Sequence, residues 1–228
     1  MKIPDITIAV DGYSSTGKSS FARLVARQFG FLYLDSGAVY RGVTLFASEH
    51  GYISGDGRVS DALKDALASL DLRFSTDGKT CIGDRCVEED IRSMAVSSLV
   101  SPVAAVPYVR DFVDARLHEL ASGGGVVMDG RDIGTTVFPD AELKIFMTAR
   151  VEVRARRRYD EMLSKGGSPD YDEVLENLRQ RDYIDSHRSA SPLRKAADAF
   201  ELDNSDMTME EELAWVRGLV QGKFGILC

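Results

Sequence analysis

The stretch IAVDGYSSTGKSS, residues 8–20, begins as an apolar run and ends in small and polar residues. The spacing from Gly12 to Ser19 matches the pattern G-x-x-x-x-G-K-[ST]. In loops of this pattern, backbone N–H groups surround a phosphate chain, the lysine reaches the outer phosphates and the hydroxyl meets Mg²⁺. The stretch therefore predicts a site for nucleotide phosphates.

The segments on either side of this loop support that interpretation. Ile6–Asp11 has the β-branched, apolar character of a buried strand. Lys18–Phe29 places its large apolar side chains on one helical face, and Gly30 is expected to end the helix. This order puts a bound anion at a helix N-terminus, where unpaired N–H groups favour negative charge. The alternative is a plain Gly/Ser turn with a solvated lysine.

Composition limits the classes of partner. The chain has 228 residues, 44% of them hydrophobic, so it can bury a substantial core. Its formal net charge is −8 and its pI is about 5. An acidic chain is a poor match for nucleic acid or an anionic membrane surface, because both partners require clustered cationic charge. We therefore expect small-molecule partners.

The cysteines and the N-terminus predict a cytoplasmic protein. Cys81, Cys86 and Cys228 are odd in number and lack CxxC or metal-ligand spacing, which favours reduced thiols and no zinc site. No apolar stretch reaches transmembrane length. The N-terminus enters the first strand without a signal-peptide pattern.

Strand-like runs that lead into helices recur along the chain and predict an α/β fold with a parallel sheet covered on both faces. The expected strands are Ile6–Asp11, Phe31–Asp35, Val126–Asp129, Leu143–Thr148 and Ala199–Asp203. A final helix is expected to begin after Thr208, which forms a capping-box pattern with Glu211.

Residues 38–125 form a long insert between the second and third strands, which we interpret as a substrate lobe. Its segments Leu70–Phe74, Lys79–Gly83 and Arg85–Glu89 alternate polar and apolar residues. Asp77-Gly78 and Gly83-Asp84 separate them and are typical hairpin turns. The insert is therefore expected to contain a small antiparallel sheet.

A second interruption, residues 149–188, carries many arginines on two helical segments around Gly166-Gly167. By themselves such helices are usually solvated faces with i,i+4 ion pairs. Beside a phosphate loop, arginines can instead stabilise the charge that spreads over a transferred phosphoryl group. The candidates for this role are Arg150, Arg154, Arg157 and Arg158.

Four further stretches carry a family resemblance. They are LDSGAVYRGVTL (34–45), SPVAAVPYVRDF (101–112), MDGRDIGTTVFPDAELKIF (128–146) and RQRDYIDSHR (179–188). Together with the phosphate loop, they resemble the bacterial cytidylate kinases of the P-loop nucleoside monophosphate kinase family, in order and over almost the whole chain.

The resemblance implies a P-loop kinase fold in a single domain, residues 1–228, with a five-stranded parallel sheet flanked by helices. Within it, residues 38–125 would form the monophosphate-binding insert with its small antiparallel sheet. Residues 150–188 would form a short helical lid and substrate-closing helices. The implied reaction transfers the γ-phosphate of ATP to CMP or dCMP, with Mg²⁺, in a monomer.

The resemblance also implies roles for particular residues. The ATP phosphates would be held by Gly12, Tyr13, Ser14, Ser15, Thr16, Gly17, Lys18, Ser19 and Ser20. Ser19 and Asp129 would serve Mg²⁺. The expected catalytic residues are Lys18, Arg131, Arg154, Arg158 and Arg188. Tyr13 stands where the family often has proline, which we expect to tune loop rigidity without loss of chemistry.

The implied CMP contacts come from several segments. Ser36, Arg41, Arg131 and Arg188 would contact the phosphate, Arg181 and Asp185 the ribose, and Ser101, Arg110 and Asp132 the base. A hydroxyl, a guanidinium and a carboxylate suit the carbonyl, ring acceptor and amine of cytosine. The steps from Arg181 to Asp185 and Arg188 would place all three on one stripe of a single helix.

Ordinary structural roles compete with these assignments. Ser36 and Ser101, the latter followed by Pro102, could each cap a helix. Arg41 and Arg110 could be surface residues. The spacing of Arg181 and Asp185 also fits a solvated i,i+4 ion pair.

Two other functions remain open from the residues alone. One is a different small-molecule P-loop kinase, acting on UMP, AMP or shikimate. The other is a nucleotide-binding switch protein without a small-molecule acceptor. A GTPase would need Asn-Lys-x-Asp for base recognition, and the nearest match, DNSD at 203–206, lacks the lysine.

Overall fold

The computed structural model describes residues 5–54, 57–75 and 78–225. The chain divides into two compact units. Unit 1 comprises residues 1–33 and 123–228, and unit 2 comprises residues 34–122. The predicted insert, 38–125, differs from unit 2 by a few residues at each end, and its role as a monophosphate-binding lobe stays a prediction.

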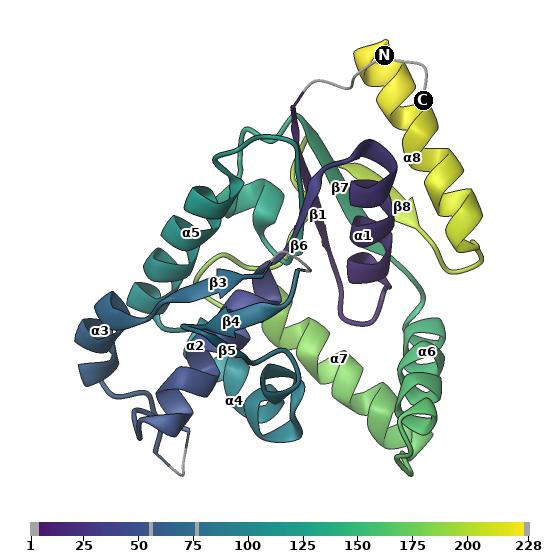
Figure 1. Cartoon of the computed structure of the whole chain (residues 1–228). Helices are drawn as coiled ribbons and strands as arrows, with labels where there is room; N and C mark the ends of the chain where they lie inside the picture. Colours follow the sequence, from purple (N-terminus) through teal and green to yellow (C-terminus); the bar gives the residue numbers. More distant parts are fainter. Residues whose placement is uncertain (1–4, 55–56, 76–77, 226–228) are drawn as a thin grey trace. The chain divides into compact units, whose positions relative to one another are not determined.

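Unit 1 is built on a five-stranded parallel sheet with the order β2-β6-β1-β7-β8 (Figure 1). The strands are β1 (Thr7–Gly12), β2 (Leu32–Asp35), β6 (Val126–Gly130), β7 (Leu143–Thr148) and β8 (Phe200–Asp203). The central strand β1 is paired on both sides, with Ile8 opposite Val127 and Leu143. This explains its continuous apolar run, and the predicted fold class is confirmed.

Helices α1 (Lys18–Phe29) and α8 (Met209–Phe224) pack against this sheet. Phe21 and Val25 of α1 share one core with Val216 and Val220 of α8 and with the apolar strand residues. As predicted, Gly30 ends α1 in the left-handed conformation. The predicted capping box of Thr208 and Glu211 begins α8.

The arginine-rich segment forms α6 (Val151–Ser164) and α7 (Tyr171–His187), which lie side by side in unit 1 (Figure 1). Their shared apolar contact is small and consists of Ala155, Val174 and Leu178 with partly buried neighbours. The turn between β6 and β7 contains one π-helical turn, Ile133–Val137.

Unit 2 combines helices with a small antiparallel sheet. The helices are α2 (Ser36–Glu49), α3 (Ala62–Ala66), α4 (Met94–Ala104) and α5 (Pro107–Ala121), with 3₁₀ turns at Leu67–Ser69 and Asp90–Arg92. The sheet has the order β3 (Leu72–Phe74), β4 (Thr80–Ile82), β5 (Arg85–Cys86). The predicted small sheet is thereby confirmed.

The third strand of this sheet is shorter than the predicted Arg85–Glu89. After Cys86 the chain turns, because the Glu88 carboxylate accepts the Thr80 N–H at 3.0 Å and the segment continues into the Asp90–Arg92 turn. Asp77, part of one predicted hairpin turn, lies outside the described residues, whereas Gly78 adopts a positive φ of 77°.

Two of the three cysteines that were predicted to be reduced thiols lie in the described part of the chain. Cys81 is buried and Cys86 is exposed, and both are free thiols. Cys228 lies outside the described residues. Within the described part of the chain, the helices are too short or too polar to cross a bilayer.

Candidate active site

The loop between β1 and α1 has the backbone conformation of a phosphate-binding loop. Gly12 and Gly17 have φ of 149° and 92°, and Ser15 adopts a left-handed φ of 59°. A Cβ at Gly12 would overlap the carbonyl oxygen of Met147 on β7, so only glycine fits there. Because Gly17 is the N-cap, α1 begins without a side-chain cap at the end where N–H groups favour anions.

The carbonyl groups of this loop are occupied by donors from within the protein. Lys18 Nζ donates to Tyr13 O at 2.6 Å, and the Thr16 hydroxyl donates to the same oxygen at 3.0 Å. Arg154 Nη1 donates to Ser14 O at 3.2 Å. Carbonyls that are held in this way leave the loop N–H groups as donors for a phosphate chain.

Lys18 is buried among charges of both signs. Burial, together with the Arg131 charge, lowers the pKa of its ammonium, while Asp129, Asp11 and Asp185 oppose this shift. An ammonium held in a low-dielectric setting interacts strongly with phosphate charge. The position therefore suits a lysine that stabilises the negative charge on the phosphates during phosphoryl transfer.

The hydroxyl of the motif meets a carboxylate from the end of β6. Ser19 Oγ donates to Asp129 Oδ2 at 2.8 Å, and Tyr33 Oη donates to Asp129 Oδ1 at 2.6 Å. A hydroxyl and a carboxylate are oxygen donors of the kind Mg²⁺ prefers, and Mg²⁺ normally completes its shell with waters and substrate phosphates. The pair therefore fits a magnesium site that binds together with a nucleotide. In the described ranges, His, Cys, Asp and Glu side chains form no cluster of three or more that could hold a metal alone.

Arg131 links the end of β6 to the phosphate loop and to α7. Its Nε donates to Asp185 Oδ2 at 2.8 Å, and its Nη2 donates to Ser14 Oγ at 2.8 Å. Asp185 therefore forms an ion pair with Arg131. Arg181 lies on the same helix and is partly exposed.

Arg188 and Asp132 form a second charged contact in unit 1. Arg188 Nη2 lies 3.4 Å from Asp132 Oδ1, and Arg188 Nε donates to Ser191 O at 2.8 Å. The predicted single-helix stripe is wrong at its end, because α7 stops at His187 and Arg188 is its C-cap with an extended ψ of 145°. The cause is a chain reversal in which Leu193 N–H donates to Asp185 O, so the next turn of helix does not form.

The arginines of α6 are in different settings. Arg154 is buried, donates to Ala149 O and Ser14 O, and pairs with Asp182 at 2.7 Å. Arg158 is partly exposed and pairs with Glu161 at 2.9 Å. Arg157 donates to Thr16 O and to Asn204. Arg150 is exposed and pairs with Asp206.

Two of the predicted CMP contacts lie on α2 in unit 2. Ser36 is buried in the first turn, but the helix is capped by Asp35, whose Oδ1 accepts the Ala38 N–H at 3.0 Å. The alternative of Ser36 as the N-cap is therefore wrong. Arg41 donates to Ser97 Oγ at 2.8 Å and to Ile91 O at 3.3 Å, so it is held within the unit.

The two predicted base contacts of unit 2 differ in exposure. Arg110 is buried, donates to Ala104 O at 3.3 Å and lies over the Tyr40 ring. Ser101 is exposed in the interior of α4, so it caps no helix terminus. The third predicted base contact, Asp132, is buried in unit 1.

Sequence reasoning missed Tyr33, Asp11 and Asn204. Tyr33 orients Asp129, and Asp11 accepts the N–H groups of Ile133 and Gly134 at 2.8 and 2.7 Å. Asn204 contacts the phosphate loop at Thr16. Asp11 and Asn204 stand where strands of the parallel sheet end, the edge at which open α/β sheets bind ligands, and this signal could have identified them.

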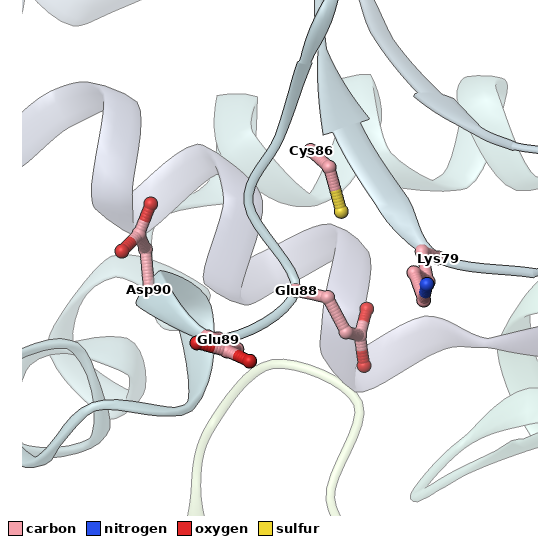
Figure 2. Close-up of a pocket in the computed structure, with 5 residues that line it drawn as sticks. All are labelled: Lys79, Cys86, Glu88, Glu89 and Asp90. Atoms are coloured by element: carbon pink, nitrogen blue, oxygen red, sulfur yellow. The ribbon is translucent and has the colours of Figure 1, made fainter.

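Unit 2 also has a pocket of about 270 Å³ lined by Lys79, Cys86, Glu88, Glu89 and Asp90 (Figure 2). None of the predicted site residues lines it. Its Glu88 carboxylate already accepts hydrogen bonds from Thr80 N and Arg92 Nε. We assign the pocket no role.

Comparisons with known proteins identify the family. The model of the family described as cytidylate kinase matches residues 8–221. A cytidylate kinase of Bacteroides thetaiotaomicron is 50% identical over 216 residues, which cover 92% of this chain and 94% of the relative. One of Flavobacterium psychrophilum is 47% identical over 220 residues, covering 94% and 97%.

A solved structure agrees with the fold. The crystal structure of an uncharacterized protein from Eubacterium ventriosum has a TM-score of 0.52 at 11% identity, covering 96% of this chain and 99% of that one. At this identity the likeness concerns the fold alone. Because the family model spans most of the chain and the curated relatives align over nearly their whole length, the chain belongs to the cytidylate kinase family.

Proposed function

We propose that this chain is a nucleoside monophosphate kinase that transfers the γ-phosphate of ATP to CMP or dCMP. Family membership supports the reaction. The observation that carries it in the structure is the phosphate loop, with Lys18 and Arg131 beside it and Ser19 against Asp129. The proposal includes a monomer in the cytoplasm that binds neither nucleic acid nor membrane.

The loop residues 12–20 bind the ATP phosphates through backbone N–H groups and the Lys18 ammonium. Bound Mg²⁺ neutralises phosphate charge, and Ser19 and Asp129 are the residues that would hold it or its water shell. Positively charged side chains stabilise the negative charge that develops on the phosphoryl oxygens in the transition state. These side chains are Lys18, Arg131, Arg154, Arg158 and Arg188. No general base is required, since positioning and electrostatics account for most phosphoryl-transfer catalysis.

The proposed CMP contacts come from several segments of the chain. Ser36, Arg41, Arg131 and Arg188 contact its phosphate, Arg181 and Asp185 its ribose, and Ser101, Arg110 and Asp132 its base. On binding, Arg131 and Asp185 exchange part of their mutual ion pair for substrate contacts, and the guanidinium of Arg131 suits bidentate phosphate binding.

A coupled assay with ATP and Mg²⁺ across CMP, dCMP, UMP and AMP tests the proposal. We expect CMP and dCMP to be the best acceptors and ATP consumption to require an acceptor. Fastest turnover with UMP or AMP would favour another monophosphate kinase. ATP hydrolysis that ignores every acceptor would favour a nucleotide switch.

Lys18→Ala tests the phosphate loop within the same assay. We expect turnover to fall by about a hundredfold or more, as is typical when a contact to developing transition-state charge is lost. Circular dichroism provides the control for an intact fold. Near-normal turnover of the folded variant would refute the assignment of the loop.

A further inference from the structure

Asn204, the first residue after β8, has all of its polar groups engaged. It is 1% exposed. Its backbone N–H donates to Thr148 O at 3.0 Å, and its side-chain Nδ2 donates to Thr16 O at 2.8 Å and to Glu212 Oε1 at 2.6 Å. Arg157 donates to its Oδ1 at 3.2 Å and to its backbone O at 2.8 Å. A buried amide with this many partners has a single orientation.

The neighbours of Asn204 determine that orientation. Arg157 has only donors to offer, so it faces the amide oxygen. Glu212 of α8 is 2% exposed, and its Oε1 faces the amide nitrogen. Between them, the second N–H of Nδ2 is directed at the carbonyl of Thr16. Elements α6 and α8 thereby orient one side chain toward the phosphate loop.

This contact fixes one peptide group of the loop. Thr16 O accepts from both Asn204 Nδ2 and Arg157 Nη1, at 2.8 and 3.1 Å, which uses both of its lone pairs. Because a trans peptide is planar, its N–H points opposite to its C=O. Holding the Thr16 carbonyl on the Asn204 side therefore directs the Gly17 N–H away from Asn204, as a donor of the phosphate-binding loop.

Gly17 itself does not determine this orientation. Its φ of 92° lies in a region that glycine reaches with little steric hindrance, and a Cβ placed there would meet only Asn204 Nδ2, at 3.8 Å. Glycine is therefore free to rotate its flanking peptides. The hydrogen bonds from Asn204 and Arg157 to Thr16 O therefore restrict the Thr16–Gly17 peptide, which Gly17 itself leaves free to rotate.

We propose that Asn204 is a positioning residue for ATP, which acts through the Thr16–Gly17 peptide and is itself oriented by Glu212. The inference rests on the proposed function only in that the loop binds a nucleotide polyphosphate. According to this proposal, the chain segment after β8 contributes to the affinity for the phosphate donor, and other residues bind the acceptor.

Asn204→Ala removes the hydrogen bond from Nδ2 to Thr16 O. We expect the Kd for ADP, measured by calorimetry without acceptor, and the KM for ATP to rise about fivefold to tenfold, as for loss of one buried hydrogen bond. The KM for CMP at saturating ATP should change less than about twofold. A purely structural role would instead lower the melting temperature and the active fraction while leaving the Kd and KM values unchanged.

Two further variants and a control sharpen the test. Glu212→Gln keeps an acceptor oxygen and should retain wild-type ADP affinity, whereas Glu212→Ala frees the amide and should weaken ADP binding. Ser205→Ala is the matched control, because Ser205 Oγ accepts the Arg150 N–H in the same chain segment without touching the loop. It should leave ADP binding unchanged.

Wild-type ADP affinity in folded Asn204→Ala would overturn the proposal, as would an equal loss in Ser205→Ala. If Asn204→Ala fails to fold, equal ADP affinity in Glu212→Ala and Glu212→Gln would overturn it. Because ADP binding requires no acceptor, a wild-type protein that phosphorylates something other than CMP would refute the proposed function and leave this result intact.

Discussion

At position 12 the backbone has a φ of 149°, and an added Cβ would overlap the carbonyl oxygen of Met147 on β7. Two independent restrictions therefore apply, one from the dihedral angle and one from the paired strand. Gly222 differs in both respects, since it lies exposed in the last turn of α8 and a Cβ there would meet nothing within 4 Å. The same substitution should have opposite effects at the two positions.

We expect Gly12→Ala to lower the free energy of unfolding by at least about 1–3 kcal/mol from backbone strain alone. It should also abolish measurable ADP binding, because β1 and β7 must separate to admit the methyl group. Gly222→Ala should raise the free energy of unfolding by about 1 kcal/mol, because alanine favours the helix. Urea titration of both variants measures the difference, and equal stabilities would contradict this steric account.

Asp11 is a buried carboxyl group of unit 1 with a raised pKa. Burial raises its pKa to about 6, the Gly134 and Ile133 N–H groups oppose the shift, and the charge of Asp132 adds to it. The folded pKa exceeds the unfolded value of 3.8, so the folded state binds this proton more tightly. The stability that Asp11 contributes is therefore complete below pH 3.8 and is lost as the pH rises toward 6.

Carbon-13 NMR of the Asp11 carboxyl should show a titration midpoint near its raised pKa of about 6. The corresponding loss of stability amounts to about 2 kcal/mol between pH 4 and pH 7, because each pKa unit corresponds to about 1.4 kcal/mol and part of the effect lies below pH 4. In Asp132→Asn the midpoint should fall, since one source of the shift is removed. A midpoint at an ordinary aspartate value in the wild type would contradict the burial argument.

At the scale of elements, the arginine-rich helices α6 and α7 carry both a buried and an exposed ion pair. On the inner side, Arg154 and Asp182 have side chains only 6% and 16% exposed and lie 2.7 Å apart. On the outer side, Arg158 and Glu161 are 37% and 45% exposed. Sequence alone gave every arginine here the same two interpretations, whereas burial separates them.

We expect Asp182→Ala to lower the free energy of unfolding by about 3 kcal/mol or more, because it leaves the Arg154 charge buried without its counter-ion. The control Glu161→Ala breaks two exposed ion pairs, with Arg158 and with Lys165, and should cost about 1 kcal/mol or less. Thermal and urea unfolding measure both. If the two losses were equal, the inner pair would contribute no more than a solvated one.

At the scale of the whole molecule, Arg110 and Asp132 are both proposed to contact the base of the acceptor, and both side chains are buried. Residues that contact the same small molecule should show energetic coupling when they are mutated together. We therefore expect acceptor selectivity to depend on Arg110 and Asp132 together.

A double-mutant cycle with Arg110→Met and Asp132→Ala tests this coupling. Each single variant should reduce the preference for CMP over UMP in kcat/KM by about 1–3 kcal/mol, since buried polar groups lose their partners. The double variant should lose less than the sum, by at least about 0.5 kcal/mol. The KM for ATP provides the control. Additive losses would show that the two residues act on different parts of the substrate or on none.

Asp185 illustrates what spacing leaves undecided. A four-residue step suggested either a ribose contact or an ion pair with Arg181, and it gave no indication of the ion pair that the carboxylate forms with Arg131, 54 positions away in sequence. Helix capping shows the same ambiguity at short range, because Asp35 and Ser36 are both good N-cap residues. Asp35 takes the role because its backbone is extended while Ser36 already lies in the helix. The ligand roles of the site residues stay predictions.

Local patterns were enough to predict the parallel α/β fold, the phosphate loop, the small antiparallel sheet and the capping box of α8, because these depend on periodicity and on hydrogen bonds between near neighbours. The partners of Asp185, Asp11 and Asn204 follow only from the folded chain. Asn204 reaches Thr16 across 188 positions because parallel pairing brings the ends of β1, β7 and β8 to one edge of the sheet. Which side chains meet at that edge depends on strand register and on burial, and local sequence patterns predict neither of the two.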